Sequence, residues 1–362
     1  MSNAECLEEL EDFLRTKPAE ITVVTMPDFF LDRLLTLHRN PSAFHKELLR
    51  VTRRKGGSID NIEQSELRGG NAVNTASALG SMGANVVPIV CTNKVGRQLL
   101  KLYLRSGKTD LSHVKLFDEP SITTALEFEA GRGKTNVMLR NVGALACFGT
   151  QCLNNDDFRV IDNADYVCIF NWAGTKQFGT RLAKVVFHRV KTSGRGKTYF
   201  DTADPTPNKD EIPSLMQSVL KRNDLDILSL NENEAICYAS LITKQARTTG
   251  LRLEQEARKA ARALAMQVHA RVDLHTTSFS GTFRGTEEIV VPAFKVPVLR
   301  ATGAGDAWDA GNIVGDANKL SDSCRLALAN AVAACYISSP DGTHATPEQL
   351  ARFCATMRKK PK

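Results

Sequence analysis

The sequence predicts an α/β fold in which a mostly parallel sheet lies between two layers of helices. Three observations support this fold class. Short β-branched apolar runs alternate with helical patterns, the 362 residues are enough to bury a large core, and no linker or internal repeat interrupts the alternation. We therefore expect a single large domain that spans residues 1–362.

The expected strands are short apolar runs, and each is followed by a longer segment with helical spacing. The strand segments are residues 21–26, 85–90, 165–170, 197–202, 225–230, 270–277 and 287–294. The helical segments are residues 71–82, 178–192, 212–222, 253–269 and 324–338. Strands that alternate with helices form parallel βαβ units, so the pattern indicates a three-layer arrangement.

Two polar stretches break the alternation, at about residues 53–68 and 121–140. Both look like polar strands with glycine-containing turns and no helix between them, and the second places GRGK (131–134) between two alternating strands, as in a hairpin. Polar strands do not suit a buried parallel sheet. We expect these segments to form a small β lid.

Composition excludes several classes of protein. Apolar residues make up 42% and charged residues 24%, as in ordinary globular proteins, and no apolar run reaches the roughly 20 residues of a spanning helix. The N-terminus is acidic and amphipathic, unlike a secretory signal. The nine cysteines are scattered, with no CxxC pair or zinc-site spacing. We expect a cytoplasmic protein with unpaired thiols and no membrane partner.

The formal net charge of +7 raises the question of nucleic-acid binding. The basic residues are dispersed and aromatic residues are only 6% of the chain, whereas single-strand binders interleave basic and aromatic side chains. We therefore expect no nucleic-acid partner. The positive excess would instead attract an anionic small molecule.

The segment VLRATGAGDAWDAGNIVG (298–315) carries the strongest chemical signal. Gly303, Ala304 and Gly305 do not shield the backbone, and a helical pattern begins at Asp306, so unpaired N–H groups could hold an anion. A carboxylate beside a phosphate is useful when it takes a proton from the attacking group. The alternative is a structural turn in which Asp306 merely caps its helix.

Two further segments supply polar side chains. In SLNENEA (229–235), Asn231 and Glu234 follow a strand, where magnesium and phosphates could be held; a plain helix cap is the alternative. In LRGGNAVNTASALGSMGA (67–84), the residues suited to binding a polyol are Gly69, Gly70, Asn71 and Asn74, although Asn71 could simply cap the helix. Asp28 and Asp32, just after the first strand, could accept hydroxyl hydrogen bonds.

Together these segments resemble the ribokinase, or PfkB-type, family of carbohydrate and nucleoside kinases. The resemblance runs over roughly residues 20–350, and its most specific part is ATGAGDAWDAG in company with SLNENEA and RGGNAVNTASALGSMGA. It implies a ribokinase-like three-layer fold and a phosphotransferase that acts on an alcohol group. Some features are closer to archaeal members of the family, in which ADP sometimes serves as the donor.

The resemblance also implies a role for each matching residue. Asp306 matches the catalytic base, and the backbone N–H groups of Gly303, Ala304 and Gly305 match the anion hole. The positions that match sugar-binding residues are Asp32, Gly69, Gly70 and Asn74, and we add Asn71 and Arg140 as acceptor contacts. Those expected at the nucleotide and its magnesium ion are Asn231, Glu234, Thr276, Ser278, Gly281 and Asn330, with Glu234 bound to the magnesium ion through water. The lid would close over the acceptor and could pair two subunits.

Three positions depart from the family pattern. Arg300 stands where an acidic residue is usual, Pro27 replaces the usual glycine ahead of the N-terminal substrate aspartate, and HTTSFSG (275–281) has Ser278 where glycine is expected. These departures leave dependence on a monovalent cation open. They also leave the details of the nucleotide pocket open.

The sequence thus predicts a magnesium-dependent kinase that uses ATP, or ADP, to phosphorylate a sugar or sugar phosphate. Three cations could bind a phosphorylated acceptor: Arg68, Lys94 and Arg140. A nucleoside acceptor is the alternative, served by the aromatic side chains Phe29, Phe30 and Phe128. A noncatalytic sugar- or nucleotide-binding regulator on the same fold is an alternative of another class.

Overall fold

A computed structural model describes residues 3–16, 18–105, 108–130, 133–243, 252–300 and 302–359. The seven predicted strands and one further strand, β13, form an eight-stranded sheet in the order β14-β13-β12-β11-β10-β9-β1-β4. Its six parallel strands are β1 (Thr22–Met26), β4 (Asn85–Pro88), β9 (Tyr166–Ile169), β10 (Lys197–Asp201), β11 (Ile227–Leu230) and β12 (Arg271–His275). The prediction of a mostly parallel sheet is confirmed.

The sheet ends in an antiparallel hairpin that sequence analysis found only in part. β13 (Phe279–Arg284) pairs with β12 and β14 (Glu287–Pro292), with His275 opposite Ser280. We expected β14 but assigned no strand to the residues of β13. Ser280, Gly281 and Thr282 have no apolar alternation, yet all three are buried because helices α9 (Leu253–Ala265) and α11 (Asp322–Ile337) pack against β13.

Two layers of helices cover the sheet, and each has its own apolar core. Successive residues of a strand point to opposite faces: Val23 of β1 packs in one core and Val24 in the other. The first layer contains α1 (Asn3–Arg15), α3 (Asn71–Ser81), α10 (Ala304–Ala317), α11 (Asp322–Ile337) and α12 (Pro347–Lys359). The second contains α6 (Gly179–Thr192), α7 (Ile212–Leu215), α8 (Glu232–Thr243) and α9 (Leu253–Ala265).

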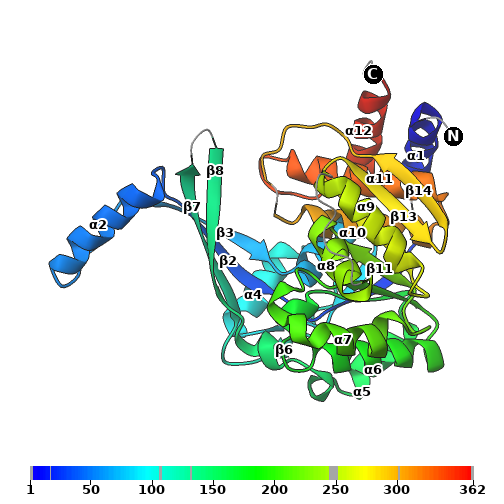
Figure 1. The fold of residues 1–362 in the computed structure, drawn as a ribbon, viewed down its shortest axis with the longest axis horizontal. Helices are drawn as coiled ribbons and strands as arrows, with labels where there is room; N and C mark the ends of the chain where they lie inside the picture. Colours follow the sequence, from blue (N-terminus) through cyan, green and yellow to red (C-terminus); the bar gives the residue numbers. More distant parts are fainter. Residues whose placement is uncertain are drawn as a thin grey trace.

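Shorter elements complete the body of the molecule. They are α4 (Lys94–Tyr103), α5 (Asn155–Asn163), the π-helical turn Met216–Leu220 that continues α7, the two-stranded sheet of β5 (Cys91–Thr92) and β6 (Lys115–Leu116), and the 3₁₀ segments Gly143–Cys147, Thr150–Cys152, Trp172–Gly174 and Thr206–Glu211. Helices α1 and α12 lie side by side near the two ends of the chain (Figure 1).

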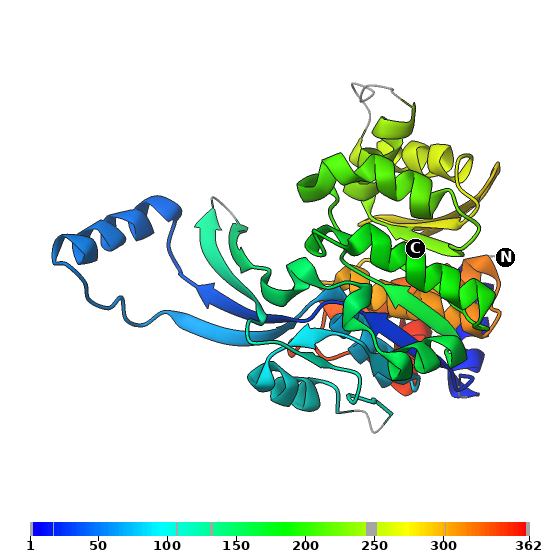
Figure 2. The same cartoon turned by 90° about the horizontal axis from the view of Figure 1, so that it is seen from below.

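A second sheet projects away from this body, with α2 (Pro41–Arg53) at its far end (Figures 1 and 2). It has the order β3-β2-β7-β8, from β3 (Glu63–Gly69), β2 (Phe30–Thr36), β7 (Ser121–Ala130) and β8 (Gly133–Asn141). The expected hairpin over 121–140 is present as β7 and β8, whose connecting residues 131–132 lie outside the described part.

The expected strand over residues 53–68 needs correction. Arg53 ends α2, and β3 begins only at Glu63, so the first half of the segment is not a strand. Helix α2 starts where Asn40 caps it, with Oδ1 accepting the Ala43 N–H at 2.9 Å, and Pro41 occupies the first turn. Strand β2, which we had not assigned, lies between β3 and β7.

No disulfide joins any cysteines in the described part of the chain, as expected. Among the same residues, no helix combines the length and apolar character needed to cross a membrane.

Candidate active site

The first turn of α10 leaves its backbone N–H groups open. Gly303 precedes the helix with φ +87°, and a Cβ there would lie 2.8 Å from the Tyr336 hydroxyl, so the turn needs glycine. No side chain caps the helix. The N–H groups of Gly303, Ala304 and Gly305 therefore lie at an uncapped, positively polarised helix end that suits an anion.

Asp306 does not cap this helix, which removes the structural alternative for its role. Its Oδ2 accepts a hydrogen bond from Asn74 Nδ2 at 2.9 Å, on α3, and the side chain is only 5% exposed. Burial raises the pKa of Asp306 to about 8; the nearby Asp201 and Asp28 carboxylates add to the rise, while the Asn74 hydrogen bond opposes it. A carboxyl group with that pKa can take a proton near neutral pH.

Asp32 lies on the second sheet with an oxygen left for a ligand. It sits on β2 directly over Gly69 of β3, and a Cβ on Gly69 would overlap its carboxyl group. Its Oδ1 is buried and has no hydrogen-bond partner in the described structure. Burial raises the pKa of Asp32 to about 6, against a Thr123 hydrogen bond and the charge of Arg140.

Both carboxylate oxygens of Asp28, the other aspartate after β1, make hydrogen bonds that hold the fold together. Its two oxygens accept the backbone N–H groups of Asn71 and Ala72 at 2.9 Å each, and Asn171 Nδ2 at 2.9 Å. Asp28, which is distant in sequence, therefore caps the N-terminus of α3, and Asn71 does not. Gly70 immediately precedes the helix. Of the two aspartates considered for hydroxyl binding, the structure leaves only Asp32 with an open oxygen.

Asn231 and Glu234 form a reciprocal cap at the start of α8. Glu234 N–H donates to Asn231 Oδ1 at 3.1 Å, while the Asn231 backbone N–H and Nδ2 donate to the two Glu234 oxygens at 3.0 and 2.7 Å. Glu234 is 2% exposed, and burial, followed by the charge of Asp201, raises its pKa. This geometry matches the capping alternative; contact with a magnesium ion stays a prediction.

The residues expected at the nucleotide occupy the β12–β14 region and α11. Thr276 Oγ1 accepts the N–H groups of Ser278 and Phe279 at 3.3 and 3.0 Å, so it holds the turn. Gly281 lies within β13, opposite Leu274.

Asn330 is fully engaged by its neighbours. Its Oδ1 accepts from Ser280 Oγ and Trp308 Nε1 at 2.5 and 3.0 Å, and its Nδ2 donates to the Pro292 carbonyl at 3.1 Å. The side chain is 4% exposed. Asn330 thus ties α10, α11 and the hairpin together, which is a structural role beside the predicted nucleotide contact.

The three cations considered for the acceptor differ in position. Arg68 lies at the site: its Nε donates to Asn74 Oδ1 at 3.0 Å, and it contacts Ser77 Oγ at 2.8 Å and His344 Nε2 at 2.7 Å. Arg140 lies over the Phe30 ring on the second sheet, 5.0 Å from its centroid. Lys94 is exposed in the first turn of α4.

The aromatic side chains considered for a nucleoside are buried. Phe29 packs edge-to-face against Tyr103, and Phe128 packs against Phe44 of α2. Phe30 is 3% exposed beneath Arg140. In this arrangement their rings serve the packing of the two sheets.

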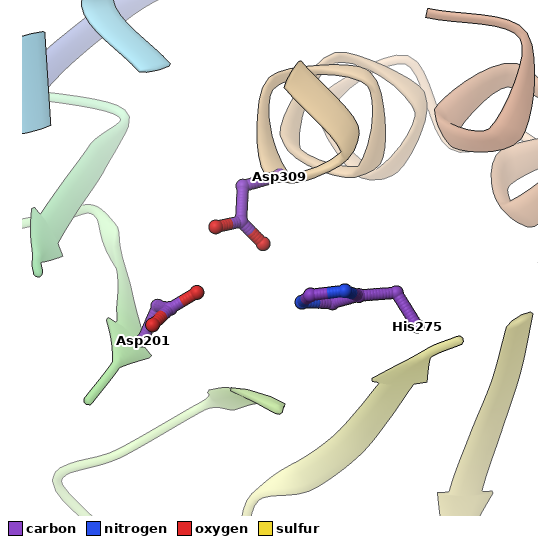
Figure 3. A group of neighbouring side chains, drawn as sticks. All are labelled: Asp201, His275 and Asp309. Atoms are coloured by element: carbon purple, nitrogen blue, oxygen red, sulfur yellow. The ribbon is translucent and has the colours of Figure 1, made fainter. Parts of the chain in front are cut away.

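Sequence analysis missed three side chains that meet beside α10. Asp201 and His275 end the parallel strands β10 and β12, and Asp309 follows Asp306 by three residues on α10 (Figure 3). One ligand atom from each lies within 4.8 Å of the others. The sequence feature that could have predicted this cluster is the position of Asp201 and His275 at the carboxyl ends of strands, where ligands bind in open α/β sheets.

An uncapped helix end beside a buried carboxylate with a raised pKa has the geometry expected of a group-transfer site, here on a three-layer α/β fold. Residues 47–349 match the family described as pfkB family carbohydrate kinase. The chain belongs to this family and is a phosphotransferase that acts on an alcohol group, as the sequence resemblance predicted.

Solved structures show the same fold at low sequence identity. A ribokinase from Cryptococcus neoformans var. grubii in complex with ADP matches with a TM-score of 0.69 and 16% identity, over 93% of this chain and 99% of that one. An adenosine kinase from Sinorhizobium meliloti matches with 0.69 and 16%, over 94% and 100%. An Arabidopsis thaliana ribokinase complexed with ribose and ATP matches with 0.67 and 19%, over 93% and 99%.

Proposed function

We propose that this protein transfers the terminal phosphoryl group of a nucleotide, ATP in preference to ADP, to a hydroxyl of a sugar or sugar phosphate, with Asp306 as the general base. The observation that carries the proposal is the position of Asp306. It is a buried carboxylate held by Asn74, with a pKa of about 8, at the uncapped first turn of α10. Basicity and anion-binding N–H groups thus meet at one point.

Three sets of groups have separate roles in the proposed reaction. The open oxygen of Asp32 accepts a hydroxyl hydrogen bond and orients the acceptor. Asp306 takes the proton of the reacting hydroxyl as its oxygen bonds to phosphorus and the bond to the departing nucleotide breaks. The N–H groups at Gly303–Gly305 stabilise the charge on the transferring phosphoryl oxygens.

A hydrated magnesium ion fits this edge of the sheet through water. Both Glu234 oxygens already accept Asn231 N–H groups, yet each carboxylate oxygen can accept a second hydrogen bond, from a metal-bound water. Asn231 and Glu234 would thus hold the ion that accompanies the nucleotide. When bound, it would neutralise charge on the phosphates.

Arg68 favours an acceptor that carries a phosphate. Within the described residues it makes no ion pair, although it is half-buried beside Asn74 and near Asp306. Its neighbour His344 is neutral near pH 7, because burial, and then the charge of Arg68, lowers the imidazole pKa. A guanidinium with donors to spare and no carboxylate partner suits an anionic group on the acceptor.

Arg300 favours independence from potassium. Its guanidinium donates to the carbonyl oxygens of Ser339 and Pro340 at 3.2 and 2.6 Å, and it lies over the Tyr336 ring. A fixed positive charge therefore already neutralises carbonyl groups in this loop. We propose that no monovalent cation is required there.

The second sheet is proposed to act as a lid over the acceptor and to pair two copies of the chain. β8 is an edge strand with three exposed apolar side chains in sequence, Val137, Met138 and Leu139. Exposed apolar edges readily pair with another strand. Light scattering tests the pairing: the wild type should be a dimer, and Met138→Lys should be a monomer.

A panel of acceptors tests the reaction itself. Sugars, sugar phosphates and nucleosides are each incubated with ATP or ADP, and phosphorylated product is measured. We expect transfer to a sugar phosphate or sugar. Transfer only to nucleosides would overturn the acceptor class, and no transfer to any alcohol would overturn the proposed reaction.

A further inference from the structure

Asp309 is a buried carboxylate on α10 with no lysine or arginine partner among the described residues. It is 0% exposed, and its Oδ1 accepts the hydroxyl groups of Tyr199 and Ser229 at 2.6 Å each. Its Oδ2 has no donor other than a protonated Asp201 carboxyl group among the described residues. By contrast, the buried Asp273 is paired with both Arg271 and Arg325. An unpaired buried carboxylate is costly, so Asp309 Oδ2 calls for a cation or a proton.

Two more side chains that can bind a metal ion, Asp201 and His275, lie next to Asp309. Asp201 is 4% exposed, and its Oδ1 accepts the Ala203 N–H at 2.9 Å. His275 Nε2 is buried and also has no hydrogen-bond partner in the described residues. Figure 3 shows the carboxyl groups of Asp201 and Asp309 and the His275 ring converging from β10, α10 and β12. Their ligand atoms lie within 4.8 Å of one another, and no lysine or arginine ion pair is found at either aspartate in the described residues.

From this geometry we propose that Asp201, His275 and Asp309 bind a divalent transition-metal ion. Two carboxylates and a neutral imidazole balance a charge of +2 and supply one nitrogen and two oxygen ligands. Magnesium and calcium prefer oxygen ligands alone, whereas manganese, cobalt and zinc also accept imidazole. The site is therefore selective for these metals over magnesium, and its ligands are other residues than the Asn231–Glu234 pair.

The proposed metal site lies beside the candidate phosphate site. A Cβ on Gly305 would lie 3.1 Å from His275 Cε1, so the imidazole packs directly beneath the first turn of α10. Its ring also contacts Trp308 in a tilted arrangement, with 5.0 Å between the ring centroids. These contacts hold the ring in place. A metal here would sit beside the anion-binding N–H groups, with positions left for water or a phosphate oxygen.

The test measures metal binding with neither nucleotide nor acceptor present, so it is independent of the kinase proposal. The full chain is stripped with a chelator and titrated with Co²⁺, followed by visible absorption, and with Mn²⁺, followed by calorimetry. We expect one ion per chain, the absorption bands of an imidazole-containing cobalt site, and no displacement by excess Mg²⁺. A chain that binds no cobalt or manganese would overturn the site.

Substitutions identify the ligands. His275→Gln and Asp309→Asn keep side-chain size but remove a ligand, and each should weaken binding at least about tenfold. His269→Gln, which changes an exposed histidine, and Asp118→Asn, which changes an exposed aspartate, are the matched controls and should bind as the wild type does. Asp201→Asn gives a third ligand variant should one of the others fail to fold, as judged by thermal melting. Wild-type affinity in a folded His275→Gln or Asp309→Asn protein would overturn the assignment.

Discussion

Replacing Asp306 by asparagine should make the protein more stable at neutral and alkaline pH. Asparagine keeps the size of the side chain and can still accept the hydrogen bond from Asn74 Nδ2. It removes a carboxyl group whose ionised form is disfavoured by burial and by the charges of Asp201 and Asp28. The wild type carries that cost whenever Asp306 is charged.

The size of this stability difference follows from the pKa of Asp306. In the folded protein it is about 8, against 3.8 for an ordinary aspartate. Between these values the folded state holds a proton that the unfolded chain releases, so stability falls as pH rises, by about 1.4 kcal/mol for each pH unit. The total loss of folding stability caused by ionisation of Asp306 is on the order of 5 kcal/mol. It is complete once the pH exceeds the pKa of Asp306 in the folded protein.

Chemical denaturation of chelator-treated protein at pH values from about 5 to about 9 measures how the ionisation of Asp306 changes the free energy of unfolding. The free energy of unfolding of the wild type, minus that of Asp306→Asn, should fall from about pH 5 to about pH 8 and then level off. Asp118→Asn, which removes an exposed carboxylate, should show no such trend relative to the wild type. Parallel pH profiles for the wild type and Asp306→Asn would refute the claim that Asp306 is held with a raised pKa.

Three further predictions concern activity. The kcat/KM of the wild type should rise with pH and level off above about 8, because Asp306 must lose its proton to act as a base; a flat profile would contradict this. Arg68→Met should raise the KM for a sugar phosphate by about tenfold to a hundredfold, from the roughly 1.5–3 kcal/mol of a charge-assisted hydrogen bond, whereas Lys94→Met, at an exposed position, should not. Wild-type activity should be equal in potassium-containing and potassium-free buffers, and Arg300→Met should become dependent on potassium; potassium dependence of the wild type would count against the role of Arg300.

Most of the sheet could be predicted from sequence because its strands are apolar and the helices between them are periodic. Strand β13 could not, since Ser280, Gly281 and Thr282 are buried by the helices α9 and α11 and have no apolar pattern of their own. Strand β2 was missed for the related reason that its burial is only partial. Such strands are defined by long-range pairing, which local composition does not record.

The site was predictable where a local motif carries its chemistry and unpredictable where chain topology assembles it. The open turn before Asp306 is visible in GAGD, but the hydrogen bond that holds its carboxylate comes from Asn74, 232 residues away. The convergence of Asp201 and His275 on α10 depends on strand order in the same way. Sequence also could not separate Asp28, which caps α3, from Asp32, which keeps an open oxygen.

Phosphoryl transfer by Asp306→Asn, compared with the wild type under saturating nucleotide and acceptor, tests the central claim most directly. Loss of the general base should lower kcat by about 10²–10⁴-fold while acceptor affinity, measured by calorimetry, changes little. A folded variant that transfers the phosphoryl group at the wild-type rate would contradict the assignment of Asp306 as the base.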